Sequence, residues 1–406
     1  MTTLTSRERV LAALHHQEPD RMPIDFGAMR STGIMAIAYN RLKAHLGISG
    51  GNTRLYDTGQ QLAEVEESVR QRFGVDVIDL TCTFPGAPIP NPEWRPWTLP
   101  DGAPCLAPAN WLPEPDGEGG LLLRNDSGVV VATMPKGVLY FEGIHHPLAE
   151  AESLADVDAY DWPLIDNDRL EYLNARARWL HDNTDYAIMA GFGGNILERG
   201  QGLRGWASFL MDLVGNRPFA EYLMDRMVEN HLQNLERFFG AVGEYIQIVQ
   251  IGDDLGTQAG PQLRPDVYHE TIHPRHKAVY SWIHERYPKV KVFLHCCGSV
   301  YDLLPDLIDE GVDVLNPVQT SAAKMDPRRL KAEFGDRISF WGGGCDTQSV
   351  LPNASPEEIR AHVRERVDIF KPGGGYVFNM VHNVQADVPP ENVVAMFDAA
   401  LEGAGY

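Results

Sequence analysis

Three residues that can bind a metal stand at the ends of two short apolar runs. His295 and Cys297 close the run Lys-Val-Lys-Val-Phe-Leu-His-Cys-Cys-Gly at 289–298, and Cys345 closes another run further along the chain. Side chains two apart on a β-strand point to the same side, so His295 and Cys297 can share one ion while Cys296 points away. One imidazole and two thiolates suit zinc, and three protein ligands leave a coordination position open for chemistry.

Each of these ligands also has a purely structural interpretation, because cysteine is among the most buried residue types and a lone strand cysteine usually fills the core. The joint pattern, His-x-Cys at one strand end and Cys at another, favours a metal site. A closed structural zinc would usually show a Cys-x-x-Cys pair, and the sequence has none. We therefore predict an open zinc site with His295, Cys297 and Cys345 as ligands.

Acidic residues follow other apolar runs. Asp253 and Asp254 come after Ile251-Gly, and Glu198 comes after Asn-Ile-Leu. Carboxylates at such places suit proton transfer or a fourth contact to the metal. The alternative is that Asp253 or Asp254 caps the following helix, and that Glu198 is a salt-bridge or capping residue. All three are candidate catalytic residues.

The last apolar run ends in His382-Asn383-x-Gln385. An imidazole and two neutral amides at this place could bind a polar substrate or the amide groups of a cofactor. Hydrogen bonding within the loop is an equal alternative. We predict His382, Asn383 and Gln385 as cofactor-binding residues.

The elements that must position these side chains are short apolar runs separated by helix-like segments, such as the amphipathic Pro218–Phe239. We predict eight buried parallel strands: Met22–Gly27, Val75–Leu80, Tyr186–Phe192, Tyr245–Ile251, Val290–His295, Val312–Val318, Ile338–Trp341 and Tyr376–Val381. This alternation predicts a (β/α)8 TIM barrel, with the three metal ligands at the mouth formed by the carboxyl ends of strands five and seven. A doubly wound open sheet is the alternative, but no Gly-x-Gly-x-x-Gly turn follows the first strand.

One stretch, Phe84–His146, interrupts this alternation because it is rich in proline and glycine. Its alternating run Leu121–Thr133 predicts an antiparallel hairpin that turns at Asn125–Gly128. We predict a single domain over residues 1–406, with an insertion at about 84–146 after the second strand. Loops at this place line the mouth of a barrel.

The composition excludes several classes of protein. A net charge of −21 argues against a nucleic-acid surface, which needs a basic footprint. The five cysteines are an odd number with two adjacent members, which is a poor disulfide framework. The chain starts in a charged amphipathic helix, which predicts no signal peptide, and no apolar run approaches the ~20 residues of a membrane span. We predict a reduced, cytoplasmic protein.

The chain resembles the uroporphyrinogen decarboxylase superfamily over nearly its whole length. The resemblance rests on Ser6-Arg-Glu-Arg-Val with Pro19-Asp-Arg-Met-Pro, on Asp253-Asp-Leu-Gly-Thr-Gln, on Gly373-Gly-Gly-Tyr-Val-Phe and on His382-Asn-Val-Gln-Ala-Asp-Val-Pro-Pro-Glu-Asn. The family fold is a (β/α)8 barrel. The decarboxylases proper carry an Arg-Gln-Ala-Gly-Arg run that holds propionate groups, but the corresponding stretch here is Asp25-Phe-Gly-Ala-Met-Arg-Ser-Thr-Gly, in which only Arg30 is basic.

The pattern of His295, Cys297 and Cys345 is similar to that of a second branch, the methylcobamide:coenzyme M methyltransferases, whose zinc ligands are His-x-Cys and a later Cys. This resemblance implies a zinc-dependent methyltransferase that moves a methyl group between a corrinoid (cobalamin) cofactor and a small molecule such as a thiol, a folate or a methoxylated compound. It also implies a separate corrinoid carrier protein as partner, and it allows a homodimer. The alternatives are a porphyrinogen-type decarboxylase assisted by a carboxylate such as Asp79, and a ligand-binding barrel without turnover.

Overall fold

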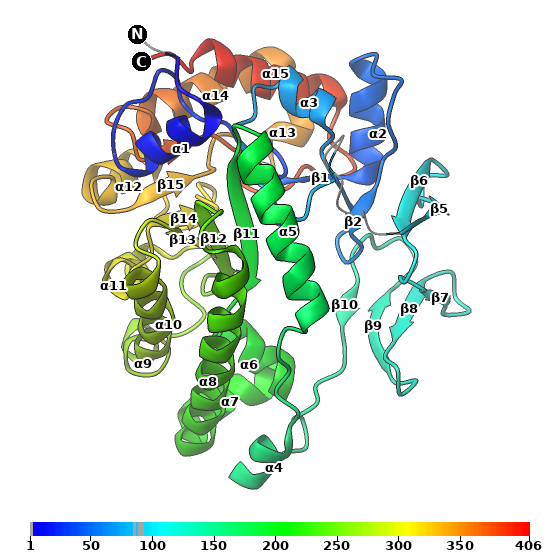
Figure 1. Cartoon of the computed structure of the whole chain (residues 1–406), viewed down its shortest axis with the longest axis vertical. Helices are drawn as coiled ribbons and strands as arrows, with labels where there is room; N and C mark the ends of the chain where they lie inside the picture. Colours follow the sequence, from blue (N-terminus) through cyan, green and yellow to red (C-terminus); the bar gives the residue numbers. More distant parts are fainter. Residues whose placement is uncertain (1–2, 84–86, 88–92) are drawn as a thin grey trace.

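The computed structural model describes residues 3–83, 87 and 93–406, and at its centre is a curled sheet of parallel strands (Figure 1). Its seven strands stand side by side in chain order: β4 (Val77–Asp79), β11 (Ala187–Gly193), β12 (Ile248–Gly252), β13 (Lys291–His295), β14 (Val314–Asn316), β15 (Ser339–Trp341) and β16 (Tyr376–Val377). A doubly wound sheet reverses its strand order at a switch point, and this sheet does not. The fold is therefore α/β and resembles a TIM barrel.

The first predicted strand, Met22–Gly27, is not a regular strand, but it hydrogen-bonds to both edges of the sheet. The Asp25 N–H donates to the Phe378 carbonyl at 2.9 Å, and the Asp76 N–H donates to the Ile24 carbonyl at 2.8 Å. Pro23 has no N–H, so this run cannot build a full ladder. Predicted strands two to eight each overlap one of the seven strands; β11 and β12 end one residue beyond their predicted bounds, and the other five lie within theirs.

Small and large apolar side chains from every strand fill the inside of the curl, as in the packed interior of a barrel. This inner cluster contains Val77, Ala187, Met189, Ile248, Phe293, Val314, Trp341 and Val377. Val10 and Leu14 of α1 (Ser6–Leu14) join it, so α1 closes the end of the curl where the strands begin. The mouth, where the strands end, is left for polar residues.

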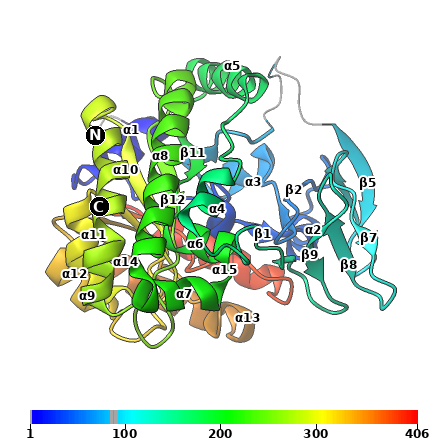
Figure 2. The same cartoon turned by 90° about the horizontal axis from the view of Figure 1, so that it is seen from below.

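Helices cover the outside of the sheet (Figure 2). Pro218 stands in the first turn of α8, whose Leu223, Met227 and Leu235 are buried as the predicted amphipathic pattern requires. Besides α1, the helices of four or more residues are α2 (Ala36–His45), α3 (Glu67–Arg72), α4 (Leu154–Ala159), α5 (Asn167–Asn183), α6 (Leu197–Arg204), α7 (Trp206–Gly215), α8 (Arg217–Val242), α9 (Pro265–Thr271), α10 (His273–Arg286), α11 (Leu304–Glu310), α12 (Pro327–Phe334), α13 (Val350–Asn353), α14 (Pro356–Phe370) and α15 (Pro390–Glu402). Among the described residues, no helix combines the length and the apolar character needed to cross a membrane.

The chain between β4 and β11 forms small antiparallel sheets beside the curl (Figure 1). They consist of β5 (Trp94–Thr98) with β6 (Pro104–Pro108), and of β7 (Glu114–Pro115), β8 (Leu121–Arg124), β9 (Val130–Met134) and β10 (Glu142–Gly143). The β8–β9 pair turns at Asn125, whose N–H donates to the Val129 carbonyl at 3.0 Å. The first residues of the predicted insertion, 84–86 and 88–92, lie outside the described residues. A third small sheet joins β1 (Ile34–Met35), β3 (Leu62–Ala63) and β2 (Leu55–Asp57).

Candidate metal centre

His295, Cys297 and His382 meet at the mouth of the curl, and their ligand atoms all lie within 4.8 Å of one another. The His295 Nε2 is 3.4 Å from the Cys297 Sγ. Cys296 lies in the core between sheet and helices, where its Sγ accepts a hydrogen bond from the Leu255 N–H at 3.2 Å. The predicted alternation is confirmed: His295 and Cys297 share one side, and Cys296 points away.

A buried asparagine fixes the orientation of the His295 ring. The Asn316 Oδ1 lies 2.8 Å from the His295 Nδ1, so Nδ1–H donates and Nε2 keeps its lone pair for a ligand. The Asn316 Nδ2 in turn donates to the Trp341 carbonyl at 2.9 Å, and the Ser31 hydroxyl donates to the Asn316 Oδ1 at 2.8 Å. Metal-ligating histidines typically have such a partner on the second nitrogen. Asn316 was not among the predicted site residues; it lies inside the predicted strand Val312–Val318 and ends the observed strand β14.

The structure places Cys345 outside this group, which differs from its predicted position. Strand β15 ends at Trp341, and the glycines at 342–343 have φ angles of +106° and +72°, so strand alternation no longer sets where Cys345 points. The Cys345 thiol is fully buried in the core between sheet and helices. Its carbonyl accepts from the Val381 N–H at 2.9 Å, which keeps its backbone beside the segment of His382.

Two of the predicted acidic residues lie next to the metal group. The Asp254 Oδ1 accepts from the Cys297 N–H at 2.7 Å and is 4.0 Å from the His295 Nε2. Burial, followed by the negative charges of Asp253 and Asp254, raises the pKa of Glu198 to about 7. Burial first, and then the charges of Asp254 and Glu198, raise the pKa of the Cys297 thiol. Asp254 and Glu198 can therefore exchange protons with a ligand bound here.

Asp253 has a different role, because it is fully buried and its oxygens are all engaged. They accept from the backbone N–H groups of residues 196–198 at 2.8–2.9 Å and lie 3.0 Å from the His276 Nε2. The carboxylate thus caps the start of α6, which precedes Asp253 in the chain, and not the following helix that the structural alternative expected. This geometry does not support the prediction that Asp253 is catalytic.

The predicted amides bind each other and the inserted segment. The Gln385 Nε2 donates to the Asn383 Oδ1 and, at 2.8 Å, to the Tyr140 hydroxyl, and the Asn383 Nδ2 donates to the Gln60 Oε1 at 2.8 Å. Together with Cys297 and His382, these amides line a pocket of about 570 Å³. They therefore shape the wall of the metal pocket, and Gln385 keeps partial exposure to it.

The donor set fits a zinc-like ion. Burial, followed by the charge of Asp254, raises the pKa of Cys297, so the thiol holds its proton until a cation replaces it. Burial, followed by the charge of His295, lowers the pKa of His382 to about 4, so this imidazole is neutral and free to coordinate. Two imidazole nitrogens and one sulfur are ligands that zinc accepts, and carboxylates stand beside them.

The sequence model of the family described as Uroporphyrinogen decarboxylase (URO-D) matches residues 142–402. The chain belongs to this family. The uroporphyrinogen decarboxylase of Chloroherpeton thalassium is 24% identical over 299 residues, which cover 70% of this chain and 79% of that protein. The enzyme of the same name from Psychromonas ingrahamii is 34% identical over 99 residues, which span 24% of this chain and only 26% of its own length.

A solved structure described as a methyltransferase from Methanosarcina mazei has the same fold as this URO-D family member. The two structures superpose with a TM-score of 0.60 and cover 98% of this chain and 99% of the other. Their sequence identity is 16%, so the likeness shows the fold alone. Known members of the family are thus named as decarboxylases, and a methyltransferase shares the architecture.

Proposed function

We propose that this protein is a zinc-dependent methyltransferase that moves a methyl group between a corrinoid and a small-molecule donor or acceptor. The observation that carries the proposal is the group of two imidazoles and one thiol at the mouth, held by strand β13 and the loop after β16. His295, Cys297 and His382 would hold the ion. Bound zinc would keep an acceptor thiol in its nucleophilic thiolate form, or would activate a methylated substrate as a Lewis acid.

The carboxylates of the site would accept the proton that the methyl-accepting thiol loses. When a thiol binds, its S–H bond breaks, and Glu198, with a pKa of about 7, can accept the proton at neutral pH. Asp254 holds the Cys297 backbone through its N–H and so keeps the thiol directed toward His295. Gln385 and Asn383 would face the corrinoid or substrate from the wall of the pocket.

The corrinoid would arrive on a carrier protein. An exposed apolar face on α7 supports a protein partner: Trp206, Met211 and Val214 are 60%, 65% and 79% exposed. Such clustered apolar exposure is typical of an interaction surface. Helix α7 packs against α6, whose first turn carries Glu198. A homodimer and a cytoplasmic location remain predictions.

The proposal includes closure of the sheet as a (β/α)8 barrel, with the segment around Ile24 as the first strand. Support comes from the hydrogen bonds of this segment to Phe378 on one side and Asp76 on the other. The small sheets between β4 and β11 are then the insertion after strand two.

Decarboxylation of a tetrapyrrole is the second candidate, because the named relatives carry that activity in their names. Asp79, whose pKa is raised by burial, would assist the proton transfer. The basic groups for many carboxylates are missing, however. Arg30, the basic residue of the stretch that corresponds to the decarboxylase arginine run, is already paired with Asp57 at 2.5 Å.

Metal analysis combined with methylcobalamin turnover, followed by absorption spectroscopy, tests the proposal. We expect about one zinc per chain, lost together with methyl transfer in Cys297→Ser. Cys296→Ser is the matched control and should keep both, because that thiol faces away from the site. His382→Ala and Cys345→Ser separate the third ligand indicated by geometry from the one predicted by sequence. Full activity of a metal-free protein would overturn the proposal, and release of carbon dioxide from uroporphyrinogen would favour the second candidate.

A further inference from the structure

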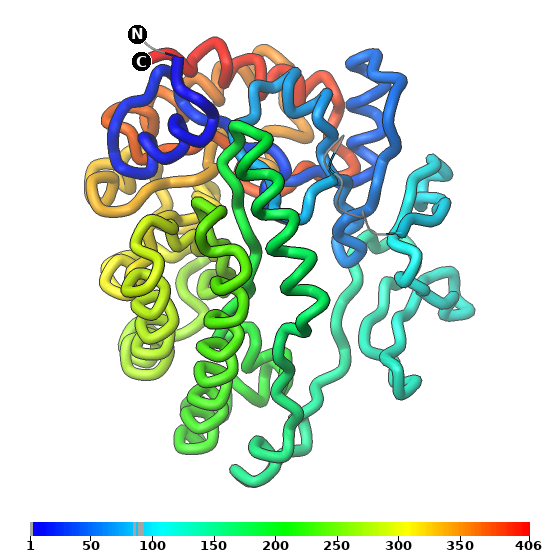
Figure 3. Tube along the Cα trace, viewed as in Figure 1, coloured from blue at the N-terminus to red at the C-terminus, as the bar shows by residue number. Residues whose placement is uncertain are grey.

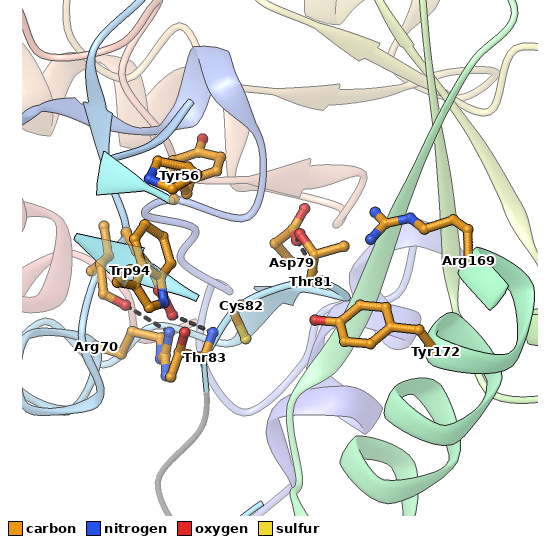
Figure 4. A pocket seen from close by; sticks show the side chains of 13 residues that line it. Tyr56, Arg70, Asp79, Thr81, Cys82, Thr83, Trp94, Arg169 and Tyr172 are labelled. Carbon is orange, nitrogen blue, oxygen red and sulfur yellow. Dashed lines mark hydrogen bonds between the residues drawn. The ribbon is translucent and has the colours of Figure 1, made fainter. Parts of the chain in front are cut away.

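A second, smaller pocket lies at the mouth on the side of β4, and β11 and β12 separate β4 from β13 in the sheet. Its volume is about 200 Å³. Asp79 and Thr81 line it from the end of β4, and Arg169 and Tyr172 line it from α5 (Figure 4). None of these residues belongs to the metal group.

The lining of this pocket holds polar atoms that nothing in the described residues satisfies. The Tyr56 hydroxyl, the Tyr172 hydroxyl and the Trp94 Nε1 are all sealed from solvent and have no hydrogen-bond partner. Buried polar groups nearly always have a hydrogen-bond partner, so three buried atoms without one around a single cavity indicate that a ligand binds there. Each can donate a hydrogen bond, and the indole can only donate. A ligand rich in acceptor oxygens would satisfy them.

The guanidinium of Arg169 offers an anion a partner in the pocket, whose lining also includes the carboxyl groups of Glu64 and Asp79. Arg169 makes no salt bridge with any described carboxylate, and its guanidinium lies 5.3 Å from the centre of the Tyr172 ring. Figure 4 shows the ends of Arg169 and Tyr172 extending from α5 toward Asp79 and Cys82 across the pocket. Burial raises the pKa of Asp79, so this carboxyl is protonated more readily and repels an anion less. Arginine binds carboxylates through paired, charge-assisted hydrogen bonds.

The volume of the pocket and the aromatic rings that line it restrict the kind of ligand that can bind. An apolar cavity of about 150 Å³ holds benzene, so about 200 Å³ holds one ring with a carboxylate and little else. A tetrapyrrole does not fit, since pockets for drug-sized ligands start at about 300 Å³. The rings of Tyr56, Trp94 and Tyr172 supply the flat apolar walls against which an aromatic ring packs well.

We propose that this pocket binds a single-ring aromatic carboxylate, with Arg169 on the carboxylate and Tyr172, Tyr56 and Trp94 as hydrogen-bond donors. The proposal goes beyond the methyl-transfer function and does not depend on it, because the pocket shares no residue with the metal group. A second ligand site at the same mouth would let the protein bind an aromatic acid whether or not a metal is present.

Isothermal titration calorimetry with benzoate and 4-hydroxybenzoate tests the proposal, and quenching of tryptophan fluorescence provides a second readout through Trp94. We expect saturable binding that weakens at least about tenfold in Arg169→Ala and several-fold in Tyr172→Phe. Arg178→Ala is the matched control, since Arg178 lies on the same helix, is exposed and pairs with Asp182. Cys297→Ser should bind benzoate as the unaltered protein does, which separates this pocket from the metal group.

Neutral and small probes complete the design. Benzamide should bind at least about tenfold more weakly than benzoate, because it lacks the charge that Arg169 pairs with. Acetate should bind more weakly too, because it lacks the ring. Equal affinity for benzamide or acetate, unchanged binding in Arg169→Ala, loss of binding in Cys297→Ser, or no saturable binding of benzoate at millimolar concentration would each overturn the proposal. Far-UV circular dichroism of each variant verifies that it is folded.

Discussion

The two sides of the barrel mouth differ in how their polar groups are satisfied. On the side of β12 and β13, Asp253 holds three backbone N–H groups and lies 3.0 Å from the His276 Nε2, and Asn316 fixes His295. On the side of β4, the Tyr172 hydroxyl and the Trp94 indole have no hydrogen-bond partner among the described residues. The first side is preorganised by its own residues, whereas the second is complete only with a ligand. Substitutions should therefore cost stability on the first side and binding on the second.

The largest effect is expected from Asp253→Asn. Asparagine removes the charge that faces His276 and places an NH2 group against N–H donors, so the free energy of unfolding should fall by about 3–5 kcal/mol. Urea denaturation measures the change. Asp336→Asn, at an 83% exposed carboxylate, is the control and should stay within about 0.5 kcal/mol. A loss below about 1 kcal/mol for Asp253→Asn would contradict the preorganised character of this side.

The same buried network predicts a dependence of stability on pH. Burial opposes the charged form of His276, but the charges of Glu310 and Asp253 outweigh it and raise the pKa of His276 from 6.5 to about 9. The folded pKa lies above the unfolded one, so this contribution is fully present below pH 6.5 and is lost as the pH rises to about 9. Its size is on the order of 3 kcal/mol. Urea unfolding across this pH range should show the decline, and His276→Gln should flatten it; an equal decline in that variant would refute the assignment.

Asn316→Ala should weaken the metal site without removing a ligand. Loss of the hydrogen bond to the His295 Nδ1 frees the ring to rotate, so zinc should bind about 10–100-fold more weakly. Competition with a chromophoric chelator measures this affinity. Asn316→Asp keeps an acceptor oxygen at the same place and should recover most of it. Equal zinc affinity in Asn316→Ala and the unaltered protein would mean that the ring needs no such support.

The smallest effect, and the sharpest contrast, is expected from two tyrosines. Tyr172→Phe removes a hydroxyl without a partner, so the free energy of unfolding should change by less than about 0.5 kcal/mol or increase. Tyr268→Phe removes a hydroxyl that donates to the Glu310 Oε1 at 2.5 Å and should cost about 1–3 kcal/mol. Thermal and urea unfolding of both variants provide the comparison. Similar costs would remove the distinction between the two sides.

The sequence predicts the preorganised side well, because its signals are local. Strand alternation places His295 and Cys297 together and turns Cys296 away, and apolar runs locate seven parallel strands. Cys345 follows glycines with positive φ beyond the end of its strand, so alternation does not fix its direction, and it is not in the group of His295, Cys297 and His382. His382 is at the mouth as predicted, but it lies in the metal group rather than among cofactor contacts.

The unsatisfied side was not predictable from sequence patterns. Tyr56, Trp94, Arg169 and Tyr172 come from three separate parts of the chain, and none stands at the carboxyl end of a strand. Only the packing of the insertion and α5 around β4 brings them to one cavity. A tyrosine without a hydrogen-bond partner leaves no trace in the sequence, since the signal is the absence of a contact in the folded protein.

The segment that joins the edges of the sheet has a consequence for synthesis. Asn379 donates to the carbonyl of Asp25, 354 residues earlier in the chain, and the Met22 N–H donates to the Ala404 carbonyl. Figure 3 shows the two ends of the chain side by side. While the ribosome is still making the C-terminal part, the segment around Asp25 has no neighbour on the side that later contacts Phe378. The nascent protein therefore exposes an unpaired sheet edge until its C-terminal part is made. Unpaired edges are prone to aggregate, so chaperones should bind most during this period.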